Sequence, residues 1–184
     1  MMAKNKRINL RPYESSDVHD TLKWINDQEI KKAINRVLPV SLFEHNEWYK
    51  RVIQDKSQVI FAIDSVADKK YIGNCGLKKI DSVVRKAEMW IYIGANGYEA
   101  QGIGNEVTLK LLQYGFNYLN LNRIYLYVAE YNKKALNLYE KIGFTQEGVF
   151  RQDIFTEGKY HNKIWLSVLK TEFDELFGRH KNPG

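Results

Sequence analysis

Residues 128–144 read Val-Ala-Glu-Tyr-Asn-Lys-Lys-Ala-Leu-Asn-Leu-Tyr-Glu-Lys-Ile-Gly-Phe, and this stretch decides the fold. It overlaps a run rich in aromatic and β-branched residues, 123–129, which predicts a strand. Asn132 is a residue type that caps helices, and Gly143 is a type that ends them. Between them, apolar positions recur at helical spacing at Ala135, Leu138, Tyr139 and Ile142. The stretch therefore predicts a strand followed closely by an amphipathic helix.

A loop with two glycines, Gln101-Gly102-Ile103-Gly104, lies upstream between a strand-like run, 87–94, and a helix-like run that starts near Asn105. The predicted buried stripe of that helix is Val107, Thr108, Leu111, Leu112, Gly115, Tyr118 and Leu119. Glycines let a ligand approach the backbone closely, and a helix N-terminus supplies amide N–H groups and a positive dipole end. The loop and Asn105 therefore predict a cradle for an anion such as a pyrophosphate.

The rest of the chain alternates between helix-like and strand-like segments. We expect strands at 8–11, 59–63, 71–77, 145–155 and 160–170, and helices from Ser15 or Ser16, over 28–35 and from Ser41. Ser41 and Glu44 match a capping box, and the helix that follows is predicted to present one face made of His45, Trp48, Tyr49, Val52 and Ile53. We expect a charged loop at 78–86. The order of elements predicts a mixed α/β sheet in one domain.

The composition fits one globular domain without disulfides. The chain has 184 residues, enough for a full apolar core, and its single cysteine, Cys75, is expected to fill space in that core. The absence of an apolar leader and of a long apolar run predicts a cytoplasmic protein. The net charge of +6 favours anionic partners, but the basic residues are scattered, so an anionic cofactor explains the charge as well as nucleic acid does. We expect no metal, no nucleic acid and no membrane partner.

The glycine loop and residues 128–144 together resemble the acyl-coenzyme A site of the GNAT N-acetyltransferases, and the order of elements resembles the GNAT fold over nearly the whole chain. The resemblance implies a single N-acetyltransferase domain over 1–177, followed by a polar tail at 178–184. It also implies a mixed, mostly antiparallel sheet flanked by helices, with two central strands that splay apart. Within the family, the RimJ/RimL-like subgroup is expected. A homodimer is left open.

Acetyl-coenzyme A is the cosubstrate that the resemblance implies. Its pantetheine arm is expected to pair, as an extra strand would, with backbone amides of the splayed strand at Trp90, Ile91 and Tyr92. The side chains of this strand are otherwise those of an ordinary core strand. Asn132 is expected to contact the pantetheine or diphosphate region of the cofactor, a role that is compatible with capping its helix.

One position of the cofactor loop departs from the family pattern. Glu99 stands where the family usually has Arg or Gln, and a carboxylate repels a pyrophosphate. We expect Gln101, Lys133 or Lys134 to offset this charge, while backbone amides remain the main donors. The departure bears on the affinity for coenzyme A and not on how it binds.

Two residues are predicted to move protons. Tyr139 lies seven residues after Asn132, where the family has a phenol that returns a proton to the leaving coenzyme A thiolate; a buried tyrosine elsewhere is ordinary core. An alkylamine is protonated at neutral pH, so some group must take its proton, and Glu88 is the candidate. The alternative for Glu88 is a solvated residue at a strand end. His45 and His161 are weaker candidates for the base.

The acceptor is the part of the function that the sequence determines least. We favour a small-molecule primary amine, and an amino-sugar nucleotide first, because aromatic and basic residues gather in the regions 24–48 and 151–165. A protein N-terminus of the ribosomal type and a polyamine are the alternatives among enzymes. A non-catalytic acyl-coenzyme A sensor is the alternative from another class, but such a module does not need the Tyr139 phenol. A nucleic-acid-binding domain comes third, since no recognition motif is present.

Overall fold

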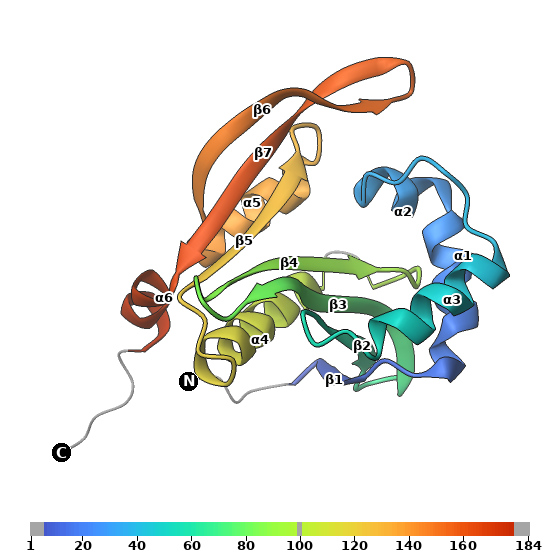
Figure 1. Ribbon diagram of the computed structural model, residues 1–184, viewed down its shortest axis with the longest axis horizontal. Helices are drawn as coiled ribbons and strands as arrows, with labels where there is room; N and C mark the ends of the chain where they lie inside the picture. The colour runs from blue at the N-terminus through green and yellow to red at the C-terminus, as the bar shows by residue number, and fades with distance from the viewer. Residues whose placement is uncertain (1–5, 99–100, 179–184) are drawn as a thin grey trace.

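The computed structural model describes residues 6–98 and 101–178, and within them seven strands form one sheet (Figure 1). The strands are β1 (Ile8–Pro12), β2 (Val59–Ser65), β3 (Lys70–Asp81), β4 (Lys86–Ile93), β5 (Arg123–Ala129), β6 (Thr145–Thr156) and β7 (Lys159–Leu169). They lie in the order β1-β2-β3-β4-β5-β7-β6, and every neighbouring pair is antiparallel except β4 and β5. The predicted mixed, mostly antiparallel sheet is confirmed.

Helices pack against both faces of this sheet. They are α1 (Val18–Asn26), α2 (Gln28–Ala33), α3 (Leu42–Val52), α4 (Ile103–Asn117), α5 (Lys133–Ile142) and α6 (Lys170–Phe177). Side chains alternate between the two faces of a strand. On β2, Ile63 joins the main core with Leu111 of α4, whereas Ala62 joins a smaller cluster with Val18 and Trp48. Figure 1 shows α1, α2 and α3 gathered at the end of the molecule away from α6.

Several predicted boundaries are wrong, each because of a local interaction. Helix α4 begins at Ile103, two residues before Asn105, because Gly102 occupies its N-cap in the left-handed conformation. Neither Ser15 nor Ser16 caps a helix; Glu14 and Asp17 form the capping box of a short 3-10 turn that leads into α1. Helix α6 was not expected, and it follows β7 without a break.

Two predicted stripe residues are also exposed, because both lie at helix C-caps. Tyr118 is 79% exposed at the end of α4, and Ile53 is 56% exposed at the end of α3. Of the predicted tail, only Gly178 is among the described residues. No helix within the described ranges is long and apolar enough to cross a membrane.

The central strands β4 and β5 separate after a short parallel contact. Their pairing is limited to Lys86 with Arg123, Ala87 with Ile124 and Glu88 with Tyr125. Beyond this point β4 continues to Ile93 beside β3, while β5 continues to Ala129 beside β7. The predicted splay of the central strands is therefore confirmed, and it leaves an opening inside the sheet.

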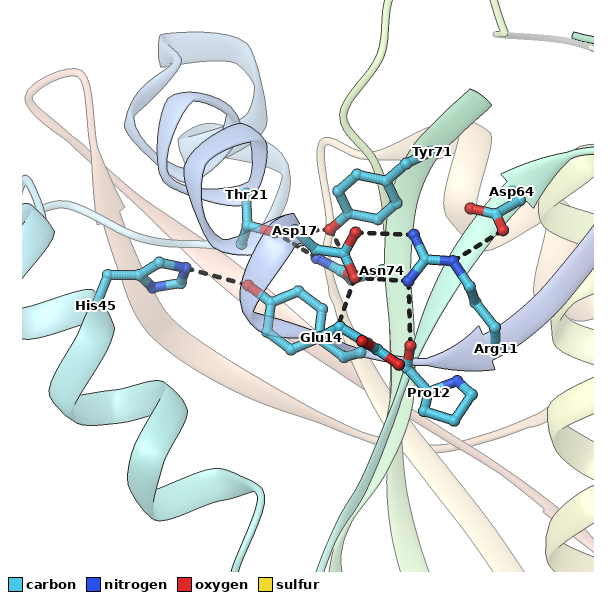
Figure 2. A network of polar contacts seen from close by, with 10 residues as sticks. Arg11, Pro12, Glu14, Asp17, Thr21, His45, Asp64, Tyr71 and Asn74 are labelled. Carbon is cyan, nitrogen blue, oxygen red and sulfur yellow. Dashed lines mark hydrogen bonds and ion pairs between the residues drawn. The ribbon is translucent and has the colours of Figure 1, made fainter. Parts of the chain in front are cut away.

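A partly buried ion-pair network joins β1, β2 and the 3-10 turn that leads into α1 (Figure 2). The Arg11 guanidinium donates to both oxygens of Asp17, at 2.7 and 2.8 Å, and to Asp64 at 2.9 Å. The Asp17 side chain is only 5% exposed, and it also accepts the backbone N–H of Glu14. A second group, Thr21, Tyr71 and Asn74, is hydrogen-bonded beside it. These contacts hold α1 against the sheet, and α1 supports the helices that line the cleft described below.

Asp17→Ala should lower the free energy of unfolding by about 2–3 kcal/mol, because it leaves a partly buried guanidinium with one carboxylate partner and removes the side chain that accepts the Glu14 N–H before α1. Urea unfolding monitored by circular dichroism measures the change. The matched control is Asp20→Ala, which removes an exposed carboxylate of the same helix whose partner, Lys23, lies at 3.4 Å. Equal midpoints for the two variants would show that the network does not stabilise the fold.

Candidate active site

The opening between β4 and β5 leads into a cleft of about 930 Å³. Six of the residues predicted for the site line it: Glu88, Trp90, Ile91, Tyr92, Asn132 and Tyr139. Residues of α2, of α3 and of the segment between them line it too, including Arg36, Glu44 and His45. The cleft thus extends from the helix that carries Tyr139, through the splayed strands, to the N-terminal helices.

Strand β4 presents unpaired backbone groups to this cleft. The Tyr92 carbonyl faces β3, because a Cβ placed on Gly73 would lie 2.4 Å from it. Backbone groups alternate in direction along an antiparallel strand. Ile91, rather than Trp90 or Tyr92, therefore turns its N–H and C=O toward the open edge. Trp90 and Tyr92 contribute side chains to the cleft instead, with their rings stacked at 6.0 Å.

Tyr139 is placed on α5 as the sequence predicts. It is 8% exposed, packs against Phe144 at 5.3 Å and lines the cleft. Burial raises the pKa of Tyr139 to about 12, so the phenol keeps its proton at neutral pH. Within the described part of the chain no other group hydrogen-bonds to its hydroxyl. This arrangement suits a proton donor whose acceptor arrives with the substrate.

Asn132 is the N-cap of α5, as expected. Its side-chain oxygen accepts the backbone N–H of Ala135 at 3.1 Å, and the residue lies on the wall of the cleft. The side-chain amide therefore holds the start of the helix that carries Tyr139. At the other end of α5, Gly143 adopts the left-handed conformation with φ 101°, which completes the predicted helix signals.

The glycine loop lies at the start of α4, outside the lining of the cleft. Gly102 has φ 74°, and the Arg7 guanidinium covers it so closely that a Cβ there would come within 2.5 Å of Arg7 Nη1. Gln101 donates to the Gly97 carbonyl at 2.7 Å. A Cβ on Gly104 would lie 3.2 Å from Leu138, so this loop adjoins α5. Glu99 lies outside the described residues.

The glycine loop offers a set of hydrogen-bond donors that fits an anionic group. The first N–H groups of α4, from Ile103, Gly104 and Asn105, precede the first intrahelical bonds, and Arg7 adds a positive charge beside Gly102. Together with the open edge at Ile91, these groups offer donors for a diphosphate and for an extended amide-containing arm. Lys134 is exposed on α5 and is not part of the cleft wall.

Glu88 lies at the point where β4 and β5 separate. Its side chain is 3% exposed and receives Lys78 and Lys79, each at 2.8 Å, and the Tyr127 hydroxyl at 2.7 Å. Burial alone would raise the pKa of Glu88, but the hydrogen bonds from these partners outweigh it, so the net shift is downward. Glu88 is therefore ionised at neutral pH. It is a solvent-sheltered carboxylate and not the solvated strand end of the alternative interpretation.

The histidines are placed differently from each other. His45 is buried in the cleft wall, stacked on Trp48 at 4.9 Å with Tyr13 at 3.4 Å, and burial lowers its pKa. His161 lies on β7 beside Tyr131 and Glu130, away from the cleft wall. His45 is thus a neutral group within the site, and His161 is outside it.

A model of the GNAT acetyltransferase domain matches residues 7–145 of the chain. The chain belongs to the GNAT acetyltransferase family. This acetyltransferase resembles the spermidine N(1)-acetyltransferase of Escherichia coli, with 29% identity over 177 residues that cover 96% of this chain and 92% of the relative. The Vibrio cholerae spermidine enzyme is 31% identical over 92% of this chain and 96% of its own. A putative ribosomal N-acetyltransferase of Bacillus subtilis is 36% identical over 58% of each chain.

Solved structures agree with these matches. The Vibrio cholerae spermidine N-acetyltransferase in complex with CoA and spermine has a TM-score of 0.87 to this acetyltransferase, with 30% identity, and covers 92% of this chain and 99% of its own. The GNAT fold is therefore confirmed, and this acetyltransferase is an enzyme that uses acetyl-coenzyme A as its cosubstrate.

The sequence analysis missed three residues that this acetyltransferase brings to the site. Arg7, which precedes β1, reaches Gly102, and Lys78 and Lys79 contact Glu88. None of them carries a local signal, since each lies at least nine residues from its partner in the sequence. The pairing of Lys78 with Glu88 across β3 and β4 is the one contact that a correct strand register would have revealed.

Proposed function

We propose that this enzyme transfers the acetyl group of acetyl-coenzyme A to a primary amine of a polyamine such as spermidine. The observation that carries the proposal is that a phenol, Tyr139, and a sheltered carboxylate, Glu88, line one cleft at the splay of β4 and β5. The similarity to spermidine acetyltransferases over nearly the whole chain supports the polyamine. The amino-sugar nucleotide, which we favoured from the sequence, has no such support.

The carboxylates and aromatic residues of the cleft offer contacts for a polyamine. Glu44 and Glu47 of α3 line the cleft together with Glu88, so three carboxylates face a ligand that carries several ammonium groups. Trp48 and Trp90 line it as well, and indole faces attract cations. Four basic residues, Arg36, Arg51, Lys78 and Lys163, also lie in the wall, which is why nucleotide sugars belong in the test.

An acceptor ammonium must lose two protons from its nitrogen to become an amide, and the departing sulfur must gain one, so one proton is released overall. Bound acetyl-coenzyme A supplies the thioester. We assign delivery of the proton to the hydroxyl of Tyr139, which is protonated and has no partner within the described residues. We assign Glu88 to hold the acceptor ammonium and to take up its proton, directly or through water. Cys75 is no rival nucleophile, since burial raises the pKa of its thiol.

Direct transfer to the amine is expected to show sequential kinetics without an acyl-enzyme. The Vibrio cholerae relative has been solved as a dodecamer. For this enzyme a homo-oligomer of at least two copies stays a prediction.

An acceptor screen tests the proposed function. Purified enzyme with acetyl-coenzyme A should release free thiol with spermidine or spermine at a kcat/KM at least about tenfold above that for the other acceptors. Those acceptors are nucleotide-linked amino sugars and peptides with ribosomal-protein N-termini. Thiol release is followed with a thiol-reactive dye, and mass spectrometry identifies the product. Preferred acetylation of a peptide α-amine would show that the acceptor is a protein N-terminus and not a polyamine. Coenzyme A binding without turnover of any amine would favour a non-catalytic acyl-coenzyme A sensor.

A further inference from the structure

Two consecutive lysines of β3 contact the same carboxylate. Lys78 Nζ lies 2.8 Å from Glu88 Oε1, and Lys79 Nζ lies 2.8 Å from Glu88 Oε2. Consecutive side chains of a regular strand point to opposite faces of the sheet, so a regular β3 would bring one of these lysines to Glu88 and turn the other away.

An irregularity in β3 explains how both lysines reach Glu88. The register between β3 and β4 shifts between Lys78 and Asp81, and Lys79 has φ 53°. This left-handed conformation is uncommon for a residue with a Cβ, and the extra residue of a bulge re-aims a side chain. Strained backbone of this kind gathers at functional sites. The bulge therefore brings a second ammonium group, that of Lys79, to Glu88.

The burial of the three partners differs sharply. The Glu88 side chain is 3% exposed, Lys78 is 40% exposed and Lys79 is 62% exposed. The carboxylate is thus fixed inside the cleft, while the Lys79 ammonium reaches it from a stem that is mostly in solvent. Of the two lysines, Lys79 has the more exposed side chain, so its ammonium can move from Glu88 into solvent with less loss of packing than that of Lys78.

Other charged and titratable groups near Glu88 come from β5 and β7. The Tyr127 hydroxyl donates to Glu88 Oε2 and accepts from Lys79 at 3.3 Å. Lys163 of β7 lies 5.2 Å from the centre of the Tyr127 ring and pairs with Asp153. Tyr125 is the other tyrosine of β5 near this carboxylate. Burial raises the pKa of Tyr125 most, and the charge of Glu88 raises it further. Of these groups only Lys78 and Lys79 bring a positive charge onto the carboxylate itself.

We propose that Lys79 is a specificity-determining residue that occupies the ammonium site on Glu88 until the acceptor arrives, and that one ammonium group of the acceptor displaces it. The proposal rests on the proposed function, because it takes a polyamine as the ligand. Lys78 stays on Glu88 Oε1 during this exchange, so the buried carboxylate is never left without a counter-ion. The exchange also selects among acceptors, because an acceptor without a suitably placed cation does not displace Lys79 from Glu88.

Lys79→Asn is the decisive variant, because asparagine tolerates the left-handed conformation and carries no charge. We expect the KM for spermidine to fall about two- to fivefold, since the ammonium that competes with the acceptor for Glu88 is gone. The KM for acetyl-coenzyme A should stay at the wild-type value. Lys79→Arg should restore the wild-type KM for spermidine, and Lys56→Asn, which removes an exposed charge elsewhere, should change neither constant.

A thermodynamic cycle distinguishes this role from a structural one. In a Glu88→Gln background, Lys79→Asn should no longer change the KM for spermidine, because the contested carboxylate is absent. An unchanged or higher KM in Lys79→Asn alone, or the same fall in the Glu88→Gln background, would overturn the proposal.

Titration of Glu88 by carbon-detected NMR gives a readout that does not depend on turnover. The Glu88 pKa should be higher in Lys79→Asn than in the wild type, because burial that raises it remains while one partner that lowers it is lost. Adding spermidine to the variant should bring the pKa down again. No response to spermidine would overturn the proposal. If spermidine shifts the pKa of Glu88 but the wild-type enzyme acetylates no polyamine, the proposed function is wrong and the exchange of ammonium groups at Glu88 is still supported.

Discussion

Tyr139→Phe should lower kcat by about 10- to 1,000-fold, because it removes the group to which we assign delivery of a proton to the leaving thiolate. The hydroxyl makes no hydrogen bond within the described part of the chain, so its removal should leave stability and coenzyme A binding nearly unchanged. Stopped-flow thiol release gives kcat, and calorimetry gives the affinity for coenzyme A.

The pH dependence of the wild type provides a second check on Tyr139. Its raised pKa of about 12 means that the phenol stays protonated up to that pH, so Tyr139 should cause no loss of kcat between about pH 7 and 10. Tyr118→Phe is the matched control, since Tyr118 is 79% exposed at the end of α4. Equal kcat values for Tyr139→Phe and Tyr118→Phe would show that Tyr139 is only a core aromatic residue.

Gly102→Val should weaken coenzyme A binding by about 100-fold or more. The position has φ 74°, which costs a β-branched residue about 1–3 kcal/mol, so valine would distort the start of α4. The new Cβ would lie 2.5 Å from Arg7 Nη1, so the flexible end of that side chain, with its positive charge, would also move away. Isothermal titration with coenzyme A measures the loss, and far-ultraviolet circular dichroism verifies that the variant is folded.

Gly148→Val is the control for this substitution. Gly148 has no left-handed φ, and nothing lies within 4 Å of a Cβ placed on it. The control should bind coenzyme A like the wild type. Equal affinities for Gly102→Val and the control would move the anion cradle away from the start of α4.

The sequence predicts the parts of the site that depend on local signals. Asn132 caps α5 and Gly143 ends it, because capping and a left-handed C′ residue are decided within one turn of helix. The splay of the central strands followed from the family resemblance, and the structure confirms it. The placement of Tyr139 in the cleft follows from the same helix.

Contacts between distant segments lie beyond this kind of prediction. The charged run at 78–86 was expected to be a loop, yet Asp81 pairs with Lys86 and extends both strands, because cross-strand pairing outweighs a polar composition. The left-handed Lys79 has no glycine or asparagine to signal it. Arg7 reaches Gly102 through the packing of β1 and α4, which no spacing in the sequence reveals.

The separation of β4 and β5 also bears on how the protein avoids self-association. Unpaired strand edges are templates for aggregation when they lie at the rim of a sheet. Of the two outermost strands, β1 is short and ends at Pro12, which blunts it as a template. The vacant edge of β4 lies instead inside the sheet, where it faces the cleft between β4 and β5. The unpaired edge that we assign to the cofactor is thus kept away from the rim of the sheet.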